Sequence, residues 1–322
     1  MLAAYAARQD SHDPLSALEV GEIEPGETPA GWITVNLKAA ALNHHDVFSL
    51  RGVGLPQERL PMILGCDGAG TLQDGTRVVV HAVIPSPGWS GDETMDPKRS
   101  LLSEVYSGTL AQQVRIPAAN AVPVPNGMSI EHAACISTSW LTAYRMLFVQ
   151  ANVQPGDTVL VQGAGGGVAS AAVQLGSAAG LRMLVTSREE ARGQRAVELG
   201  AEAAFESGAR LPRKVDAVLE TVGKATWSHS IKSMRPGGTL VIAGTTSGPQ
   251  PDNAELTRIF FQQMRIQGST MGTRAEMTQM LSLMTSRKIE PAIDSVRPLD
   301  QARDAFAAMI DGTAFGKLVL TI

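Results

Sequence analysis

The sequence predicts an α/β protein that joins a doubly wound parallel sheet to an antiparallel, barrel-like β domain. A glycine-rich turn lies between two predicted strands in the middle of the chain, Thr158–Gln162 and Leu181–Arg188. Strands and helices alternate from there to about residue 270. Short strands separated by glycine and proline turns fill the first 118 residues, with little helical periodicity. A chain of 322 residues is long for one core, so two domains are expected.

The glycine turn reads Gly163-Ala-Gly-Gly-Gly-Val-Ala-Ser170 and is followed by an alanine-rich helix. Glycines at such a bend let backbone N–H groups approach a pyrophosphate at the positive end of the helix. The strict G-x-G-x-x-G pattern fails at Val168, whereas a version one residue longer fits Gly163, Gly166 and Ala169. Because the turn lies between two strands, we expect a bound dinucleotide; the alternative is a purely structural turn.

The end of the second strand indicates which dinucleotide binds. An NAD site usually has an acidic residue there, which accepts hydrogen bonds from the ribose hydroxyls. Here the strand ends at Ser187 and Arg188, and Arg192 follows one helical turn later. A hydroxyl and two guanidinium groups suit a 2′-phosphate, so we predict NADP(H). Glu189 and Glu190 are expected to point elsewhere; the alternative is a solvated helix start with ordinary charge pairs.

Composition excludes several classes of protein. With 44% hydrophobic and 18% charged residues the chain is typical of a globular protein, and its net charge of −4 offers no basic surface for nucleic acid. Cys66 and Cys135 lie far apart and indicate neither a disulfide framework nor a zinc knuckle. No apolar run approaches about 18 residues, and the N-terminus does not resemble a signal peptide. We therefore expect no membrane partner and a cytoplasmic location.

The predicted elements follow from hydrophobic alternation and from turn residues. In the first half, Ile84–Gly108 is polar and rich in proline, glycine and serine, and predicts a long surface excursion. Pro123, Pro125 and Gly127 indicate the domain boundary, placed after residue 122. The predicted strands are Trp32–Lys38, Arg77–Val80, Val114–Ile116, Val215–Glu220, Thr239–Ala243, Arg265–Thr270 and Lys317–Ile322. The predicted helices are Ser129–Val149, one ending near Leu199, one from about Ala225, Gly272–Arg287 and Asp300–Asp311.

Several short stretches occur together in one order along nearly the whole chain. They are Asn43-His-His-Asp46, Arg51-Gly52, Pro61–Gly70, Gly108–Gln112, Thr142-Ala-Tyr144, Gly163–Ala169, Gly200-Ala201, Arg235–Gly238, Ser269–Gly272 and Gly316–Val319. In these stretches the chain resembles the medium-chain dehydrogenase/reductase superfamily, and within it the zinc-independent quinone-oxidoreductase-like branch of NADPH:quinone and enone reductases. The set is far more specific than the glycine turn alone.

The resemblance implies a GroES-like β domain made of residues 1–122 and 271–322, with a Rossmann NADP(H)-binding domain at 123–270 between them. It also implies a homodimer paired through the strand Arg265–Thr270. The nicotinamide is expected close to Asn43, Thr142 and the Met271-Gly272 backbone, with Lys317 nearby. The complete predicted cofactor set is Asn43, Thr142, Gly163, Gly165, Gly166, Gly167, Val168, Ser187, Arg188, Arg192, Thr221, Val222, Gly244, Thr245, Met271, Gly272 and Lys317.

The resemblance also allows a test for zinc. The places of the catalytic zinc ligands in related alcohol dehydrogenases are taken here by Asn43, Cys66 and about Thr138, which predicts no metal. The cysteine-rich lobe of those enzymes is also missing, because Pro85–Ser107 contains no cysteine. A rearranged metal site from Cys66, Asp67, His45 and His81 remains an alternative.

Without a metal, the chemistry implied is hydride transfer from NADPH to a quinone or an α,β-unsaturated carbonyl compound, followed by protonation. His45 is the candidate proton donor, because it falls where related zinc enzymes place a hydroxyl that touches substrate, and because imidazole titrates near neutrality. The alternative is that His44 or His45 only caps the following helix. Two other functions stay open: an alcohol dehydrogenase with an atypical zinc site, and a non-catalytic NADPH-binding protein.

Overall fold

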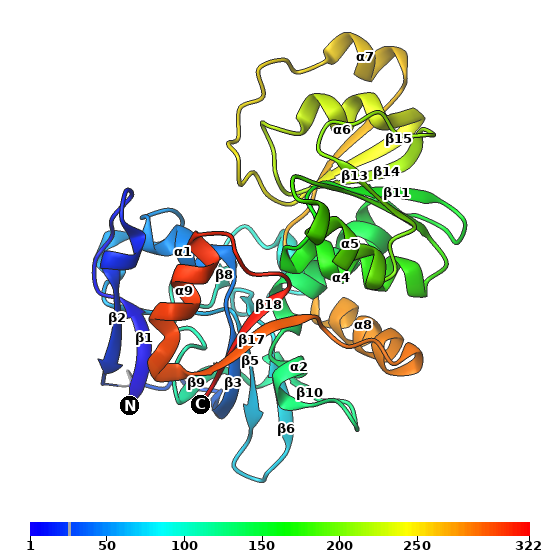
Figure 1. Ribbon diagram of the computed structural model, residues 1–322. Helices are drawn as coiled ribbons and strands as arrows, with labels where there is room; N and C mark the ends of the chain where they lie inside the picture. The colour runs from blue at the N-terminus through cyan, green and yellow to red at the C-terminus, as the bar shows by residue number, and fades with distance from the viewer. Residues whose placement is uncertain (25–26) are drawn as a thin grey trace. The chain divides into compact units, whose positions relative to one another are not determined.

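The computed structural model describes residues 1–24 and 27–322, which form two compact units (Figure 1). Unit 1 consists of Met1–Leu141 and Met271–Ile322, and unit 2 of Thr142–Thr270. The first boundary lies after Leu141 rather than after residue 122, because the helical segment that follows Ser129 packs on strands of unit 1. None of the described helices is long and apolar enough to cross a membrane.

Within residues 142–270, unit 2 contains one parallel sheet of six strands in the order β13-β12-β11-β14-β15-β16. Its strands are β11 (Thr158–Val161), β12 (Arg182–Ser187), β13 (Ala203–Glu206), β14 (Val215–Glu220), β15 (Met234–Ile242) and β16 (Arg265–Gly268). The central strands β11, β12 and β14 are buried along most of their length, as parallel strands covered on both faces must be. The predicted doubly wound parallel sheet is confirmed.

The helices of unit 2 pack on this sheet. Its α-helices are α4 (Gly167–Ala178), α5 (Glu190–Glu198), α6 (Trp227–Ser233) and α7 (Leu256–Phe261). Figure 1 shows α4 and α5 on one face and α6 on the other. Helix α4 approaches the sheet closely, since a Cβ atom at Gly176 would lie 2.3 Å from Met183 Sδ. This explains why the helix is built from small residues.

Unit 1 is mostly antiparallel β structure. Its described strands are β1 (Leu2–Ala6), β2 (Leu18–Glu22), β3 (Trp32–Ala41), β4 (Met62–Ile63), β5 (Asp67–Thr71), β6 (Arg77–Val80), β7 (Val83–Ile84), β8 (Ser100–Leu101), β9 (Gln113–Pro117), β10 (Ala121–Pro123), β17 (Ile293–Pro298) and β18 (Lys317–Thr321). The main sheet has the order β10-β6-β5-β3-β18-β17, with β9 also paired to β3. The segment that returns to this unit therefore supplies β17 and β18, and β18 enters the sheet beside β3.

Helices and short turns lie between these strands along the chain. They are α1 (His44–Leu50), α2 (Ile130–Ala133), α8 (Arg274–Arg287) and α9 (Ala302–Ile310), with short 3₁₀ turns η1 (Pro14–Ala17), η2 (Gln57–Arg59), η3 (Glu93–Met95), η4 (Ala118–Asn120) and η7 (Leu299–Gln301). Helix α8 begins with a capping box, in which the Thr273 hydroxyl accepts from the Glu276 N–H and the Glu276 carboxylate accepts from the Thr273 N–H.

Two predicted segments differ from the structure in detail, although Ser129 is the N-cap of a helical segment as predicted. The predicted helix Ser129–Val149 is divided into α2, a π-helical turn η5 (Ile136–Trp140), the short α3 (Leu141–Tyr144) and a second π-helical turn η6 (Arg145–Gln150). The segment Ile84–Gly108 is not simply a surface excursion, because Leu102 and Ser103 are fully buried. Asp96 organises this segment by accepting hydrogen bonds from both the Ser86 N–H and the Ser86 hydroxyl, which allows a polar stretch to pack inward.

Candidate functional site

The glycine turn of unit 2 has the geometry that anion binding requires. Gly163 has φ of 81° and Gly165 has φ of 105°, a region that favours glycine because it has no Cβ atom. Gly166 is the N-cap of α4, and a Cβ atom added there would meet nothing within 4 Å. Gly167 and Val168 are the first helical residues, so their N–H groups have no acceptor within the helix and lie at the positive end of a 12-residue helix.

The end of β12 carries the residues predicted to bind a 2′-phosphate. Arg188 is exposed, whereas the Ser187 hydroxyl is already bonded to the backbone of Glu189, donating to its carbonyl over 2.7 Å. Arg192 Nε lies 3.1 Å from Glu189 Oε2. The expectation that Glu189 points away is therefore wrong: Glu189 is the N-cap of α5, three residues before Arg192, and its side chain reaches the guanidinium. The Arg192 guanidinium is therefore already paired with a carboxylate in this structure.

A hollow of about 440 Å³ lies beside this strand end. It is lined by Ser187, Arg188, Gly193, Ala204 and Glu206, among others. Its volume falls in the range usual for small-molecule sites. Arg188 and the acidic residues Glu189, Glu190 and Glu206 therefore line a space large enough for one end of a ligand.

Two further loops of unit 2 follow neighbouring parallel strands, β14 and β15. The first begins with Thr221 and Val222, and the second begins at Ala243 and continues with Gly244 and Thr245. Thr221, Val222, Gly244 and Thr245 were all predicted to bind the cofactor. The loops are bonded to each other, because the Thr246 N–H donates to the Thr221 carbonyl over 3.2 Å. They lie at the carboxyl ends of the strands, where open α/β sheets bind ligands. Thr142, also predicted, is buried at the start of unit 2.

A buried ion pair joins three segments of unit 1. Lys317 Nζ donates to Asp67 Oδ2 over 2.7 Å, to Asn43 Oδ1 over 2.8 Å and to the Leu42 carbonyl over 2.8 Å. Lys317 is 2% exposed and Asp67 is fully buried. All three donors of the ammonium group are used, so the ion pair is fully hydrogen-bonded on the lysine side. Asn43 and Lys317, which the sequence analysis assigned to the cofactor, are therefore bound to each other.

These residues do not fit a zinc ion. At the places of the catalytic ligands in related alcohol dehydrogenases, Asn43 binds an ammonium group and the Cys66 thiol donates to the Leu102 carbonyl over 3.2 Å. Asp67 Oδ1 and Thr138 Oγ1 lack a hydrogen-bond partner in the described part of the chain. A carboxylate oxygen and a hydroxyl do not form the nitrogen- and sulfur-rich tetrahedron that zinc prefers.

The alternative metal site is also not assembled. Cys66 contacts His45, Asp67 contacts Lys317, and His81 bonds to backbone carbonyls, so the four proposed ligands belong to three separate sets. No cluster of three or more metal-binding side chains occurs among residues 1–24 and 27–322. The structure therefore does not bring these four side chains together as one ligand set.

His45 lies between a carboxylate and a thiol. Its Nε2 is 3.1 Å from Glu104 Oε1, and its Nδ1 is 3.6 Å from Cys66 Sγ and 3.5 Å from Ser103 Oγ. Burial opposes the charged imidazolium, but a Cys66 thiolate, the Glu104 carboxylate and Asp46 outweigh burial and raise the pKa of His45 well above its ordinary value. Burial raises the pKa of the Cys66 thiol while His45 lowers it, so the charge of each group depends on that of the other.

Two partners of His45 were missed from the sequence. Glu104 and Ser103 lie in the segment taken for a surface excursion, 58 to 59 residues from His45 along the chain. Ser103 is fully buried and has φ of 65°, an uncommon conformation for a residue other than glycine. Strained backbone of this kind often occurs at functional sites. A positive φ at a serine is visible only in the structure, so the sequence contained no indication of it.

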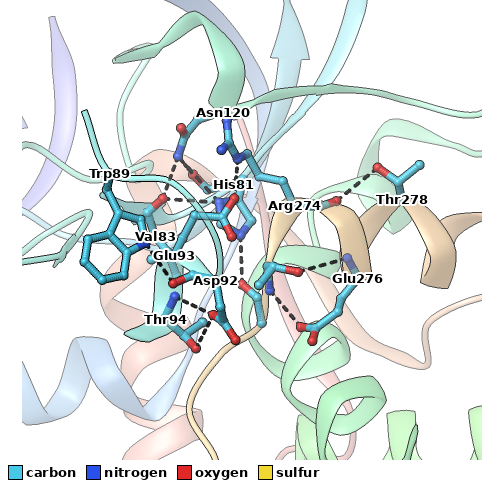
Figure 2. A network of polar contacts seen from close by, with 12 residues as sticks. His81, Val83, Trp89, Asp92, Glu93, Thr94, Asn120, Arg274, Glu276 and Thr278 are labelled. Atoms are coloured by element: carbon cyan, nitrogen blue, oxygen red, sulfur yellow. Dashed lines mark hydrogen bonds and ion pairs between the residues drawn. The ribbon is translucent and has the colours of Figure 1, made fainter. Parts of the chain in front are cut away.

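The backbone of Gly272, predicted with Met271 to contact the cofactor, is held by His81. Figure 2 shows this network at the start of α8. His81 Nε2 is 3.0 Å from the Gly272 carbonyl, and the Arg274 guanidinium pairs with the buried carboxylate of Glu93 over 2.5 Å. Burial lowers the pKa of His81, so the ring stays neutral. His81 is thus a buried structural residue that fixes the backbone at Gly272.

Comparisons with known proteins agree with this architecture. Residues 29–126 match the family model of the alcohol dehydrogenase GroES-like domain, and residues 167–286 match that of the zinc-binding dehydrogenases. A solved structure of an NAD-dependent alcohol dehydrogenase is 31% identical, covers 100% of both chains and superposes with a TM-score of 0.91.

Relatives from curated proteins include an acryloyl-coenzyme A reductase of Metallosphaera sedula, 27% identical over 94% of this chain and 96% of the relative. An alcohol dehydrogenase of Geobacillus stearothermophilus is also 27% identical, over 95% of this chain and 96% of the relative. A crotonyl-CoA carboxylase/reductase solved in complex with NADP is 23% identical with a TM-score of 0.90, and shows the shared fold.

The fold and these matches define a nicotinamide-dependent oxidoreductase. The chain belongs to the medium-chain dehydrogenase/reductase superfamily, in its quinone-oxidoreductase-like branch. The GroES-like and Rossmann assignments made from the sequence are confirmed.

Proposed function

We propose that the protein is an NADP(H)-dependent reductase that transfers hydride to an α,β-unsaturated carbonyl compound or a quinone without a catalytic metal. The observation that carries the proposal is the end of β12, where Arg188 and Arg192 follow Ser187 in the place of an acidic ribose-binding residue. The names of relatives give further support, since they include acryloyl-coenzyme A reductase and crotonyl-CoA carboxylase/reductase.

Each part of unit 2 has a defined role in this proposal. The N–H groups at the start of α4 bind the pyrophosphate, and Arg188 and Arg192 bind the 2′-phosphate. When bound, the dinucleotide supplies the hydride. The protein contributes orientation, which accounts for a large share of the rate when the reacting group is the cofactor.

The function is tested by following NADPH oxidation by the purified protein against quinones, enones, enals and enoyl thioesters, each with and without a chelator. Turnover of one of these classes that persists with chelator is the expected result. Turnover only with a simple ketone or aldehyde, lost on chelation, would instead support an alcohol dehydrogenase, a function that the 31% identical structure favours. Tight NADPH binding with no turnover of any acceptor would indicate a non-catalytic binding protein.

His45 is proposed to supply the proton that follows hydride transfer. The imidazolium is the acid, and Glu104 stabilises it. Because the pKa of His45 is raised, the acid form persists above neutral pH, and turnover is expected to fall as the pH rises through that pKa. Ser103 Oγ lies 3.5 Å from Nδ1, within reach of a hydrogen bond from the imidazolium.

The pH profile of turnover measures this role. His45→Ala is expected to remove the alkaline limb and to lower turnover by about 10²–10⁴-fold, the usual contribution of general acid catalysis. Glu104→Gln is expected to move the limb to lower pH, because the amide does not stabilise the imidazolium. His44→Ala is the matched control and keeps the wild-type limb. An unchanged profile in His45→Ala would assign the proton to another donor.

We propose a homodimer joined through β16 and the adjacent α7. Strand β16 is the last in its sheet and all four of its residues are exposed, so its outer edge has no partner strand within unit 2. Leu256, Phe260 and Phe261 of α7 are between 64% and 70% exposed, an arrangement more typical of an interface than of a free surface.

Sedimentation velocity tests the dimer. The wild-type protein is expected to sediment as a dimer, and Phe260→Glu together with Phe261→Glu is expected to give monomers with unchanged secondary structure. Val296→Glu, which introduces the same charge at an exposed apolar residue of unit 1, is the control and leaves the dimer intact. Dimers that persist in the double variant would place the interface elsewhere.

A further inference from the structure

Glu220, the last residue of β14, is a fully buried carboxylate with no ion pair in the described part of the chain. Its charge is stabilised by hydrogen bonds alone. Oε1 accepts from the Val222 N–H over 2.8 Å and from the Gly223 N–H over 3.0 Å. The Thr226 hydroxyl reaches both oxygens, and Ser230 Oγ donates to Oε2 over 2.6 Å. A buried carboxylate is stable only where hydrogen-bond donors satisfy its oxygens. Glu220 therefore requires the loop conformation that brings the N–H groups of Val222 and Gly223 to it.

The loop after β14, which is bonded to Glu220, is also bonded to the loop after β15. The Ser247 N–H donates to the Val222 carbonyl over 2.7 Å, and the Lys224 N–H donates to the Gly248 carbonyl over 2.9 Å. Gly223 has φ of 89°, and a Cβ atom there would lie 2.6 Å from the Gly248 carbonyl oxygen. Backbone hydrogen bonds therefore link the two loops, and Glu220 joins them to the end of β14.

A chain of buried hydrogen bonds continues from Glu220 to the glycine turn. The Gly163 N–H donates to Thr186 Oγ1 over 3.1 Å, and that hydroxyl donates to Gln162 Oε1 over 2.7 Å. Gln162 Nε2 donates to Ser230 Oγ over 2.9 Å, and Ser230 donates to Glu220. The hydroxyls of Thr186 and Ser230 each accept one of these hydrogen bonds and donate the next one, toward Gln162 and Glu220 respectively. Every donor and acceptor in the chain from Gly163 to Glu220 is therefore assigned.

All four side chains of this buried relay (Thr186, Gln162, Ser230 and Glu220) are at most 1% exposed. They come from the ends of three adjacent strands and from α6. The relay thus ties the turn after β11 to the loop after β14 through side chains rather than through the sheet alone. The last position of the relay, residue 220, requires a carboxylate, because both of its oxygens accept hydrogen bonds. A glutamine there would place its NH₂ group against the N–H of Val222 and Gly223 or the hydroxyl of Ser230, which are donors themselves.

We propose that the buried relay is a positioning device that holds the loop of residues 221–226 at a fixed spacing from the glycine turn, so that the pyrophosphate site and the loops beyond it are formed before the dinucleotide binds. The inference rests on the proposed function, since it assigns the loops after β14 and β15 to the nicotinamide half of NADP(H). Glu220 is its positioning residue and touches neither cofactor nor substrate.

Isothermal titration with two probes tests the proposal. NADPH spans the whole site, whereas 2′-AMP occupies only the end near Arg188 and has no pyrophosphate. Glu220→Gln is expected to raise the Kd for NADPH by about tenfold or more, the effect of losing one charge-assisted hydrogen bond, while the Kd for 2′-AMP stays within about twofold. Equal losses for both probes, or no loss for either, would overturn the relay as a positioning device.

A second pair of variants keeps the test independent of how well Glu220→Gln folds. Thr186→Ser keeps the hydroxyl and is expected to retain wild-type affinity for both probes. Thr186→Val keeps the shape but breaks the relay, and is expected to weaken NADPH binding selectively; equal behaviour of the two variants would contradict the inference. If the wild-type protein binds no NADPH at all, the proposed function itself is wrong. If the wild-type protein binds NADPH but the variants show no selective loss, only the inference about the relay is wrong.

Discussion

Lys317→Met will lower the free energy of unfolding by about 3–5 kcal/mol, the usual cost of leaving one partner of a buried ion pair unpaired. The remaining partner, Asp67, is fully buried and one of its oxygens already has no hydrogen-bond partner in the described chain. Removing the ammonium group leaves the other oxygen uncompensated as well. Methionine matches the length of the lysine stem, so the loss reflects charge rather than volume. Urea unfolding followed by tryptophan fluorescence measures it.

Two controls separate this effect from a general loss of lysine. Lys224 and Asp252 form an ion pair of 2.8 Å on the surface of unit 2, with side chains 47% and 83% exposed. Lys224→Met is expected to cost no more than about 1 kcal/mol, since exposed pairs contribute little. The double variant Lys317→Met with Asp67→Asn is expected to recover much of the lost stability, because the buried charge is gone. Equal costs for the two lysines would contradict the role assigned to the buried pair.

Arg188→Asp combined with Arg192→Ala is expected to reverse the coenzyme preference. Each charge-assisted hydrogen bond to a phosphate contributes about 1.5–3 kcal/mol, so losing two guanidinium partners raises the Kd for NADPH by about 100-fold or more. The new aspartate and the released Glu189 provide carboxylates for the ribose hydroxyls of NADH, whose Kd is expected to stay the same or fall. Fluorescence titration with both coenzymes measures the change.

Arg182→Ala is the matched control for this prediction. Arg182 is on the same strand, β12, but at its opposite end, where its guanidinium pairs with Glu202 over 2.8 Å on the surface. Its removal takes away one positive charge from unit 2 and leaves both Kd values unchanged. An unaltered ratio of NADPH to NADH affinity in the double variant would show that the 2′-phosphate is bound elsewhere.

Local patterns along the chain determined much of this protein. The β-branched run Thr158–Val161, the glycines after it and the small residues of α4 are neighbours in the sequence, so their strand, turn and helix could be predicted from spacing alone. The end of β12 at Ser187 was predictable for the same reason. The fold class followed, because alternating strands and helices allow few arrangements other than a parallel sheet.

Contacts between distant residues were decided only by the tertiary structure. Lys317 and Asp67 are 250 positions apart, and the members of the buried relay come from β12, β14, α6 and the residue after β11. No periodicity records which buried polar side chains will meet, because a polar residue is placed inside by its partner rather than by its own hydrophobicity. Even the pairing of Glu189 with Arg192, only three residues apart, depended on which residue became the N-cap of α5. The sequence by itself thus determined the sheet and the dinucleotide turn, while burial in the folded chain decided which charges are paired and which loops are held.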